Sequence, residues 1–161
     1  PAVKYIAAAV FCVIATFVVV AVGVVVGAIL FGAGPLTLLS GTQVSLAEGL
    51  ARCLAVVAYV SVSMLGLTAI GVLLSTLTTV PVGAMAATAI LAVAAQIVGQ
   101  IPQLSALHPY LFTDRWLDFG ALLRSPISWD SSAGNALLQA VWIVIAAALA
   151  VWRFTTRDVL T

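Results

Sequence analysis

Four uninterrupted apolar runs are the feature that most constrains this chain. They cover about residues 5–31, 53–74, 82–101 and 136–152, and none of them contains Asp, Glu, Lys or Arg. The hydrocarbon core of a bilayer is about 30 Å thick, so a helix of about 20 apolar residues crosses it. At a rise of about 1.5 Å per residue the first run reaches roughly 40 Å, which allows tilt. The sequence therefore predicts an all-α, polytopic transmembrane bundle.

The composition favours the same class. The chain holds 64% hydrophobic and only 7% charged residues, whereas soluble domains carry roughly 25% charged residues. So few charges could not cover a surface that faces water. A net charge of +1 offers no basic face for nucleic acid. Cys12 and Cys53 lie in apolar runs without a Cys-x-x-Cys pattern, and we interpret them as inert thiols.

The connections between the runs carry start and stop signals. A stretch rich in Gly and Pro at residues 32–35 ends the first helix, and a polar loop follows to about Ser45. Ser45 with Glu48 resembles a capping box, which predicts that the next helix begins there. Glu48 and Arg52 are then four residues apart on one helical face, where they can form an ion pair. The short link at residues 75–81 predicts antiparallel second and third spans.

Several polar side chains lie inside the predicted spans. They are candidates for lining a path or for joining helices: Gln96, Gln100, Asn135, Gln139, Ser61, Ser63 and Thr68. The four amides are expected at one membrane depth, where they could bond across two helices or line a wet vestibule. Hydroxyls in membrane helices mostly bond to their own helix or to a neighbour. Gly23 and Gly27 form a GxxxG pair, which predicts a close approach by another helix.

Residues 102–131, which we call the cap segment, interleave charged with aromatic side chains. This mixture suits short helices lying in the membrane interface before the last span. The candidate cap or gate residues are Asp114, Arg115, Trp116, Asp118 and Arg124. The segment is predicted either to cover the helix ends or to gate a path. His108 has no acidic or histidine partner at ligand spacing, so no metal site is predicted.

Four spans place both chain ends on one side of the membrane. Lys4, Arg153 and Arg157 share that side, and Arg52, Arg115 and Arg124 lie opposite. The equal count leaves the positive-inside rule undecided, while the acids beside the opposite arginines favour cytoplasmic ends. The sequence has no P-loop, no nucleophile–histidine motif and no ionisable residue in the middle of a span. We therefore expect no catalytic, cofactor-binding or metal-binding residues, and no proton coupling.

Four pieces of sequence together carry a family resemblance. They are the Lys4-Tyr5-Ile6 entry, GVLLSTLTTVPVGA at residues 71–84, HPYLFTDRWLDFGALLRSPISWD at 108–130, and AVWRFTTRDVL at 150–160. In their order and spacing the chain resembles the type-2 permease subunits of bacterial ATP-binding cassette (ABC) exporters for drugs and antibiotics. The last two pieces are the most specific of the four, and the aromatic and basic exit directly after the last span is a habitual ending of these permeases.

That resemblance implies a six-helix permease, of which this chain would be helices three to six. The chain would be a single transmembrane domain, incomplete on its N-terminal side and lacking the coupling helix, in the bacterial plasma (inner) membrane. Two ATPase subunits holding ATP and Mg²⁺ would power it, and a second permease subunit would complete the path for an amphipathic or drug-like compound. The cap segment would be extracellular and the tail at 153–161 cytoplasmic. Residues on the ATPase side would be Lys4, Thr76, Thr78, Arg153 and Arg157.

Two other functions stay open at this stage. A membrane anchor or scaffold subunit that transports nothing would explain the lack of ionisable groups equally well. An enzyme acting on lipid would use Asp114, Asp118 or His108 of the cap segment. The permease reading makes the chain itself a non-enzyme, with ATP hydrolysed by its partners.

Overall fold

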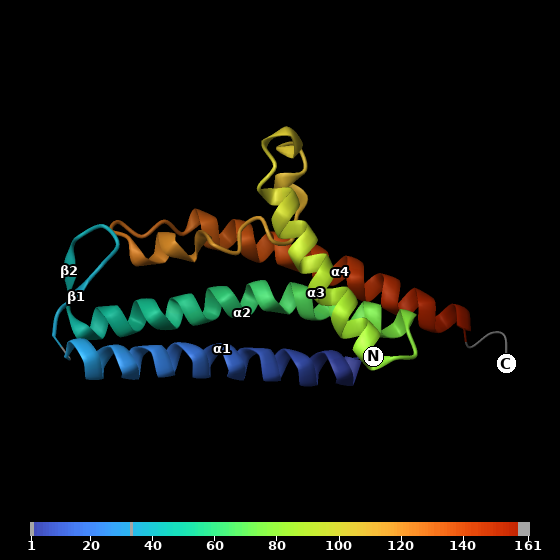
Figure 1. Cartoon of the computed structure of the whole chain (residues 1–161), viewed down its shortest axis with the longest axis horizontal. Coiled ribbons are helices and arrows are strands. Elements are labelled where there is room, and N and C mark those ends of the chain that lie inside the picture. The colour runs from blue at the N-terminus through green and yellow to red at the C-terminus, as the bar shows by residue number, and fades with distance from the viewer. Residues whose placement is uncertain (1, 33, 158–161) are drawn as a thin grey trace.

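The computed structural model describes residues 2–32 and 34–157. Its four long helices are α1 (Ala2–Phe31), α2 (Leu46–Leu77), α3 (Pro81–Gly99) and α4 (Asp130–Arg157). All four are long and apolar enough to cross a membrane. The predicted helical architecture with four helices of spanning length is therefore confirmed (Figure 1).

Helix α2 is the centre of the bundle, because it packs against α1, α3 and α4. Figure 1 shows α1, α2 and α4 lying alongside one another, while α3 crosses them steeply. The start of α1 and the end of α4 lie at the same end of the bundle, as an even number of spans requires (Figure 1). A small apolar core forms where α2, α3 and the cap segment meet, around Ile70, Ala95 and Phe112.

A two-stranded hairpin joins α1 to α2, where only a polar loop was predicted. Strands β1 (Leu36–Thr37) and β2 (Gln43–Val44) pair antiparallel. Gly41 forms the turn between them with φ of 80°, and Gly32 follows the end of α1 with φ of 82°. Both angles lie in the left-handed region that glycine adopts at little cost. The hairpin turn is therefore favoured by glycine at position 41, and the end of α1 by glycine at position 32.

The helix starts follow the sequence signals. Ser45 is the N-cap of α2, and its Oγ accepts a hydrogen bond of 3.3 Å from the Glu48 backbone N–H. Pro81 is the first residue of α3, where its missing N–H costs nothing. The Ser45 cap was predicted and is confirmed.

The helix boundaries differ from the apolar runs, most clearly at the end of α3 and at both ends of α4. Helix α3 ends at Gly99 with Gln100 as its C-cap, two residues before the predicted end. Helix α4 begins at Asp130 and continues through Arg157, so the predicted tail at 153–161 starts as helix. Polar residues at the end of a helix can keep a helical backbone. Hydropathy marks only the apolar part of the helix and therefore misses these terminal turns.

The cap segment contains three short 3-10 helices, as its sequence predicted: η1 (Pro102–Leu104), η2 (His108–Tyr110) and η3 (Asp118–Leu123). Helix α3 has 19 residues, whereas α2 has 32 and α4 has 28. At about 1.5 Å per residue the two longer helices extend well beyond the length of α3. The η3 part of the cap segment packs on α2 and α4, while η1 contacts α3, whose end it follows.

Candidate functional site

A buried polar cluster joins α2, α4 and the cap segment. Asn135 and Gln139 lie one turn apart on α4 and are 1% and 0% exposed. The Asn135 Nδ2 donates to Ser63 Oγ at 2.8 Å, and Ser63 Oγ donates to the Tyr59 carbonyl at 3.1 Å. The Gln139 Nε2 donates to the Phe112 carbonyl at 2.7 Å and to Asn135 Oδ1 at 3.3 Å. Because a buried polar group without a partner is costly, these bonds fix how the three elements meet.

Two aromatic side chains extend this contact. The Tyr59 hydroxyl donates to the Arg115 carbonyl at 2.5 Å, and the Trp142 indole donates to the Tyr110 carbonyl at 3.0 Å. The Trp142 ring also packs edge-to-face against Phe112, with centroids 5.7 Å apart. The helices therefore hold the cap segment mainly through its backbone carbonyls, whose position depends on the path of the chain and not on the side chains there.

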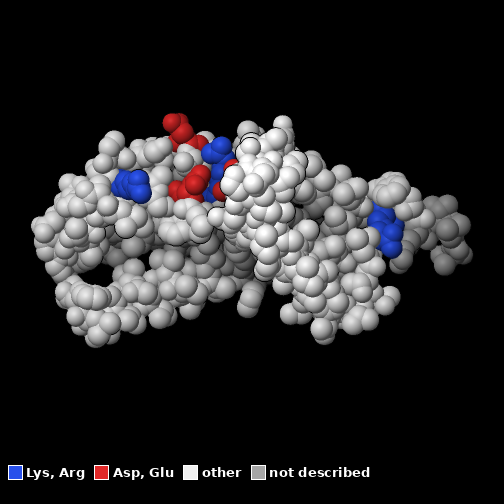
Figure 2. Space-filling model, turned by 45° about the horizontal axis from the view of Figure 1, so that its top comes forward, with Lys and Arg blue, Asp and Glu red and all other residues white. Residues whose placement is uncertain are grey.

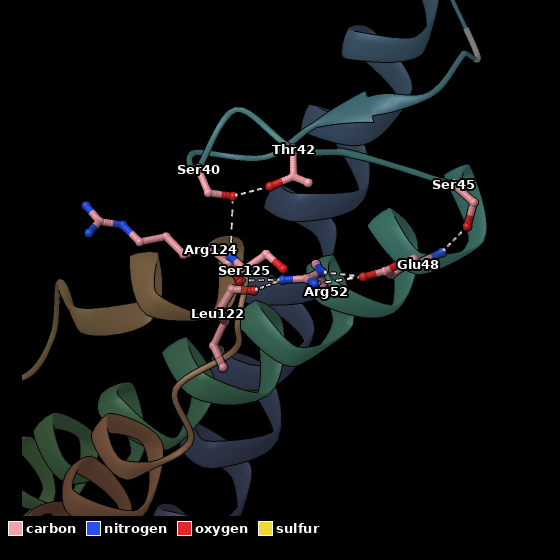
Figure 3. A network of polar contacts seen from close by, with 8 residues as sticks. All are labelled: Ser40, Thr42, Ser45, Glu48, Arg52, Leu122, Arg124 and Ser125. Atoms are coloured by element: carbon pink, nitrogen blue, oxygen red, sulfur yellow. Dashed lines mark hydrogen bonds and ion pairs between the residues drawn. The ribbon is translucent and has the colours of Figure 1, made fainter.

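Arg52 of α2 makes a second attachment (Figure 3). Its guanidinium is almost wholly buried, and Nη1 donates to the carbonyls of Leu122 at 3.1 Å and Arg124 at 2.8 Å. Its Nη2 and Nε donate to Glu48 Oε1 at 2.7 and 3.2 Å. The ion pair predicted between Glu48 and Arg52 is thus confirmed. Glu48 thereby holds the Arg52 guanidinium beside two carbonyls, that of Leu122 in η3 and that of Arg124 just after η3. A cation is favourable beside the carbonyls at a helix end.

The hairpin is tied to the same place. The Leu39 N–H donates to the Leu123 carbonyl at 3.1 Å. The Ser125 N–H donates to Ser40 Oγ at 3.3 Å, and Ser40 Oγ lies 2.8 Å from Thr42 Oγ1 (Figure 3). The end of the bundle that carries the hairpin is therefore a continuous hydrogen-bonded assembly of hairpin, η3 and the start of α2.

Two glycines that the sequence did not single out make this packing possible. A Cβ on Gly66 would lie 1.9 Å from Gln139 Oε1, and a Cβ on Gly134 would lie 2.7 Å from an Arg115 guanidinium nitrogen. Any larger residue would displace the side chain that it meets. Nothing in the local sequence marks these glycines, since the side chains that require them come from distant parts of the chain.

The four amides expected at one depth do not form one group. Gln96 is half-buried and Gln100 is exposed on α3. Together with Trp116 they line a shallow groove of about 330 Å³. Among the described residues neither forms a hydrogen bond with Asn135 or Gln139. The hydrogen bonds across helices that were one of the two uses foreseen for the amides are made by Asn135 and Gln139 alone, and a common membrane depth of all four stays a prediction.

The hydroxyls in α2 differ from one another. Ser63 belongs to the buried cluster, whereas the Thr68 hydroxyl donates to the Met64 carbonyl at 2.8 Å within its own helix. Ser61 is 6% exposed, and its Oγ has no hydrogen-bond partner among the described residues.

The charged residues of the cap segment gather on one face (Figure 2). Asp114 and Arg124 are exposed there, while Arg115, Trp116 and Asp118 are half-buried. Glu48–Arg52 is the one ion pair among the residues that the structure describes. The charged side chains of the cap segment thus form a charged surface without ion pairs among the described residues, and the choice between a cover and a gate stays open.

The opposite end of the bundle holds the residues expected on the ATPase side. Arg153 Nε donates to the Thr76 carbonyl at 3.3 Å, which joins the end of α4 to the end of α2. The Thr76 hydroxyl donates to the Leu73 carbonyl at 2.7 Å, and Thr78 Oγ1 accepts from the Val80 N–H at 3.2 Å. Lys4 is exposed. The side chain of Arg157 lies outside the described part.

Within residues 2–32 and 34–157 no three His, Cys, Asp or Glu side chains cluster as metal ligands. The His108 ring nitrogen Nε2 lies 3.2 Å from the Ile101 carbonyl. Cys12 and Cys53 are free thiols. Comparison of the chain with known protein families, with curated proteins and with solved structures finds no match.

Proposed function

We propose that this chain is the membrane-spanning permease part of an ABC exporter, which moves an amphipathic or weakly polar compound across the bacterial plasma membrane. Separate ATPase subunits would hydrolyse ATP with Mg²⁺, and a second permease subunit would supply the other half of the path. The sequence resemblance motivates the proposal. One structural observation supports the proposal. Hydrogen bonds join α2 to α4 at one end of the pair, and join both helices to the cap segment toward the other end.

At one end, Arg153 joins the last turns of α4 and α2 beside the turn that leads into α3. At the other end, Tyr59, Arg52 and Gln139 hold the cap segment through its carbonyls. A push on the α2–α3 turn would therefore reach the cap segment through two long helices that move together. Such a lever is what a transporter driven from one side of the membrane needs. The apolar faces of the helices also suit a weakly polar cargo better than a small ion.

The test is purification of the full-length protein in mild detergent, with identification of whatever accompanies it. We expect a stoichiometric cytoplasmic ATPase whose turnover depends on the membrane protein. Reconstituted vesicles should then accumulate or expel an amphipathic dye only when ATP is supplied. A membrane protein recovered alone under several gentle conditions, with no ATP-dependent dye movement, would reject the proposal.

A non-transporting anchor or scaffold subunit is the second candidate. The observation that favours it is that Ser63, Asn135 and Gln139 bond to one another and to the cap segment. Side chains used in this way hold a bundle together and are not free for cargo. A partner complex that assembles on the chain without any ATPase would favour this function.

A further inference from the structure

A cavity of about 260 Å³ lies between the start of α1, the second half of α2 and the second half of α4. Tyr5 forms its wall on α1, Ala69 and Val72 form its wall on α2, and five alanine or β-branched residues between positions 143 and 151 form its wall on α4. Tyr5 is the one polar side chain among the described residues that line it. An apolar cavity of about 150 Å³ is enough to bind benzene. We call this space the chain-end cavity, because the start of α1 and the end of α4 border it.

Two cations lie on the chain-end side of this cavity. Lys4 directly precedes Tyr5 on α1, and Arg153 follows Val151 on α4. The Arg153 Nε donates to the Thr76 carbonyl at 3.3 Å, which holds this half-buried guanidinium beside the end of α2. The Lys4 side chain is exposed. Both cations therefore come from the helices that form the walls, and both lie between these walls and the ends of the helices.

Neither cation has an acidic partner within residues 2–32 and 34–157. The four acids of this part of the chain lie toward the opposite end of the bundle: Glu48, Asp114, Asp118 and Asp130. Asp158 lies outside the described residues. Figure 2 shows the acidic side chains gathered on one half of the molecule, with a separate basic patch toward the other end. A guanidinium carries five N–H donors, and the described residues accept only the Nε donor of Arg153.

Aromatic side chains place these cations at a membrane surface. Trp152, which is 65% exposed, adjoins Arg153, and Tyr5 adjoins Lys4. Trp and Tyr gather at the level of the lipid headgroups, where Lys and Arg extend their charged ends toward water. The chain-end cavity continues from this level toward the middle of the helices. Cations at headgroup level beside an apolar cavity match the two parts of a phospholipid, its charged head and its acyl chain.

The charge of the site selects an anionic lipid. Guanidinium and ammonium groups bind phosphate through charge-assisted hydrogen bonds, and basic residues beside a membrane attract anionic headgroups. A zwitterionic headgroup brings a cation of its own, which offsets part of this attraction. A peptide would bring unpaired backbone groups against the apolar walls. We propose that Lys4 and Arg153 bind the phosphate of an anionic phospholipid whose acyl chain enters the chain-end cavity. This inference does not depend on the proposed function.

The test is native mass spectrometry of the full protein in mild detergent, with phosphatidylglycerol and phosphatidylcholine of identical acyl chains added in equal amounts. We expect at least fivefold more phosphatidylglycerol than phosphatidylcholine in the bound fraction. Arg153→Gln and Lys4→Gln should each lower this preference at least twofold, because each removes one of two cations. The matched control is Arg124→Gln, which removes an exposed cation at the opposite end and should leave the preference unchanged.

The cavity is tested by a second pair of variants that change no charge. Ala147→Leu adds a larger side chain at an exposed position of the cavity wall, and it should lower the binding of phosphatidylglycerol at least threefold. Ala140→Leu is the control, at an exposed position two turns earlier on α4 that does not line the cavity. Equal binding by these two leucine variants would contradict an acyl chain in the cavity.

Three further outcomes would overturn the proposal. One is equal binding of the two lipids by the wild type, or a preference that survives both glutamine variants. Another is competition by glycerol phosphate as strong as that by phosphatidylglycerol, because the acyl chain would then contribute nothing. The third is a second protein chain bound in place of lipid and lost in Arg153→Gln, which would assign this surface to a protein. None of these readouts uses ATP, so failure here is separable from failure of the exporter proposal.

Discussion

Helices α1 and α2 have similar length and apolar character but opposite kinds of packing. In the most apolar stretch of 18 residues of α1, no part is buried inside the molecule, whereas 39% of the corresponding stretch of α2 is buried. The Tyr5 hydroxyl, which donates to the Leu65 carbonyl at 3.4 Å, is the one side-chain hydrogen bond recorded between the two. Helix α2 instead contributes Arg52, Tyr59 and Ser63 to bonds with the cap segment and α4.

The difference shows where structural specificity comes from in a bilayer. Lipid tails are as apolar as Val and Ala, so an apolar helix face gains little by leaving lipid for protein. Polar groups and close backbone contacts discriminate between packings, because each has few acceptable partners. The α2–α4 pair has both, through Gln139 against Gly66. Helix α1 contributes only the Tyr5 bond, and we infer that its seating on α2 is correspondingly loose.

The largest expected effect comes from changing one glycine in each region. Gly66→Ala should lower the free energy of unfolding by about 3 kcal/mol, because the new methyl displaces Gln139 and leaves the Phe112 carbonyl unpaired. Gly27→Ala should change it by less than about 0.5 kcal/mol, since nothing lies near that position. Unfolding in mixed detergent micelles measures both. Equal losses from the two variants would remove the distinction between the regions.

Arg52 and Arg124 offer a matched pair at the cap segment. Arg52→Met should lower the free energy of unfolding by about 2 kcal/mol, because the Leu122 carbonyl of η3 and the Arg124 carbonyl that follows it lose a charged donor. The Arg124 side chain is exposed and points away from the network (Figure 3), so Arg124→Met should cost less than about 0.5 kcal/mol. Limited proteolysis should cut the cap segment faster in the Arg52 variant alone. Slow cleavage in both variants would argue against Arg52 as an attachment of the cap segment.

The amides separate a structural role from a path-lining one. Gln139→Ala should cost about 1.5 kcal/mol of unfolding free energy, because a buried bond to the Phe112 carbonyl is lost. Gln96→Ala, on half-buried α3 surface without such a bond, should cost less than about 0.5 kcal/mol. Transport assays with two amphipathic dyes complete the test. A changed dye preference in Gln139→Ala at unchanged stability would reverse our assignment and make this side chain part of a path.

Much of the fold was predictable, because the signals are local. Apolar runs of spanning length give the four helices, and Ser45 with Glu48 gives the start of α2. The charged and aromatic mixture of the cap segment correctly indicated short helices. Each of these signals is contained within a few turns of chain and needs no knowledge of a partner element.

The candidate site was predictable only in part, because it depends on how distant elements cross. Asn135 and Gln139 were selected only as candidates for lining a path or joining helices. Their burial and their partners, Ser63 and the Phe112 carbonyl, follow from the packing of α4 on α2 and on the cap segment. Gln96 was grouped with them by expected membrane depth, and depth alone does not say which side chains bond to one another. Gly66 had no signal at all, since its role exists only when Gln139 lies against it.

The smallest effect is expected at the end opposite the cap segment. Arg153 donates a single bond of 3.3 Å to the Thr76 carbonyl, so Arg153→Ala should cost about 0.5–1 kcal/mol of unfolding free energy. The more telling readout is local, because that bond holds the last turn of α2 beside α4. Amide hydrogen exchange should speed up at residues 76–81 and, by a smaller factor, in the cap segment, because the α2–α4 pair joins the two ends. Lys4→Ala, which removes an exposed cation at the same end, should alter neither. Exchange that stays unchanged in the cap segment of the Arg153 variant would mean that the two ends are not coupled, against what a lever driven from one side of the membrane requires.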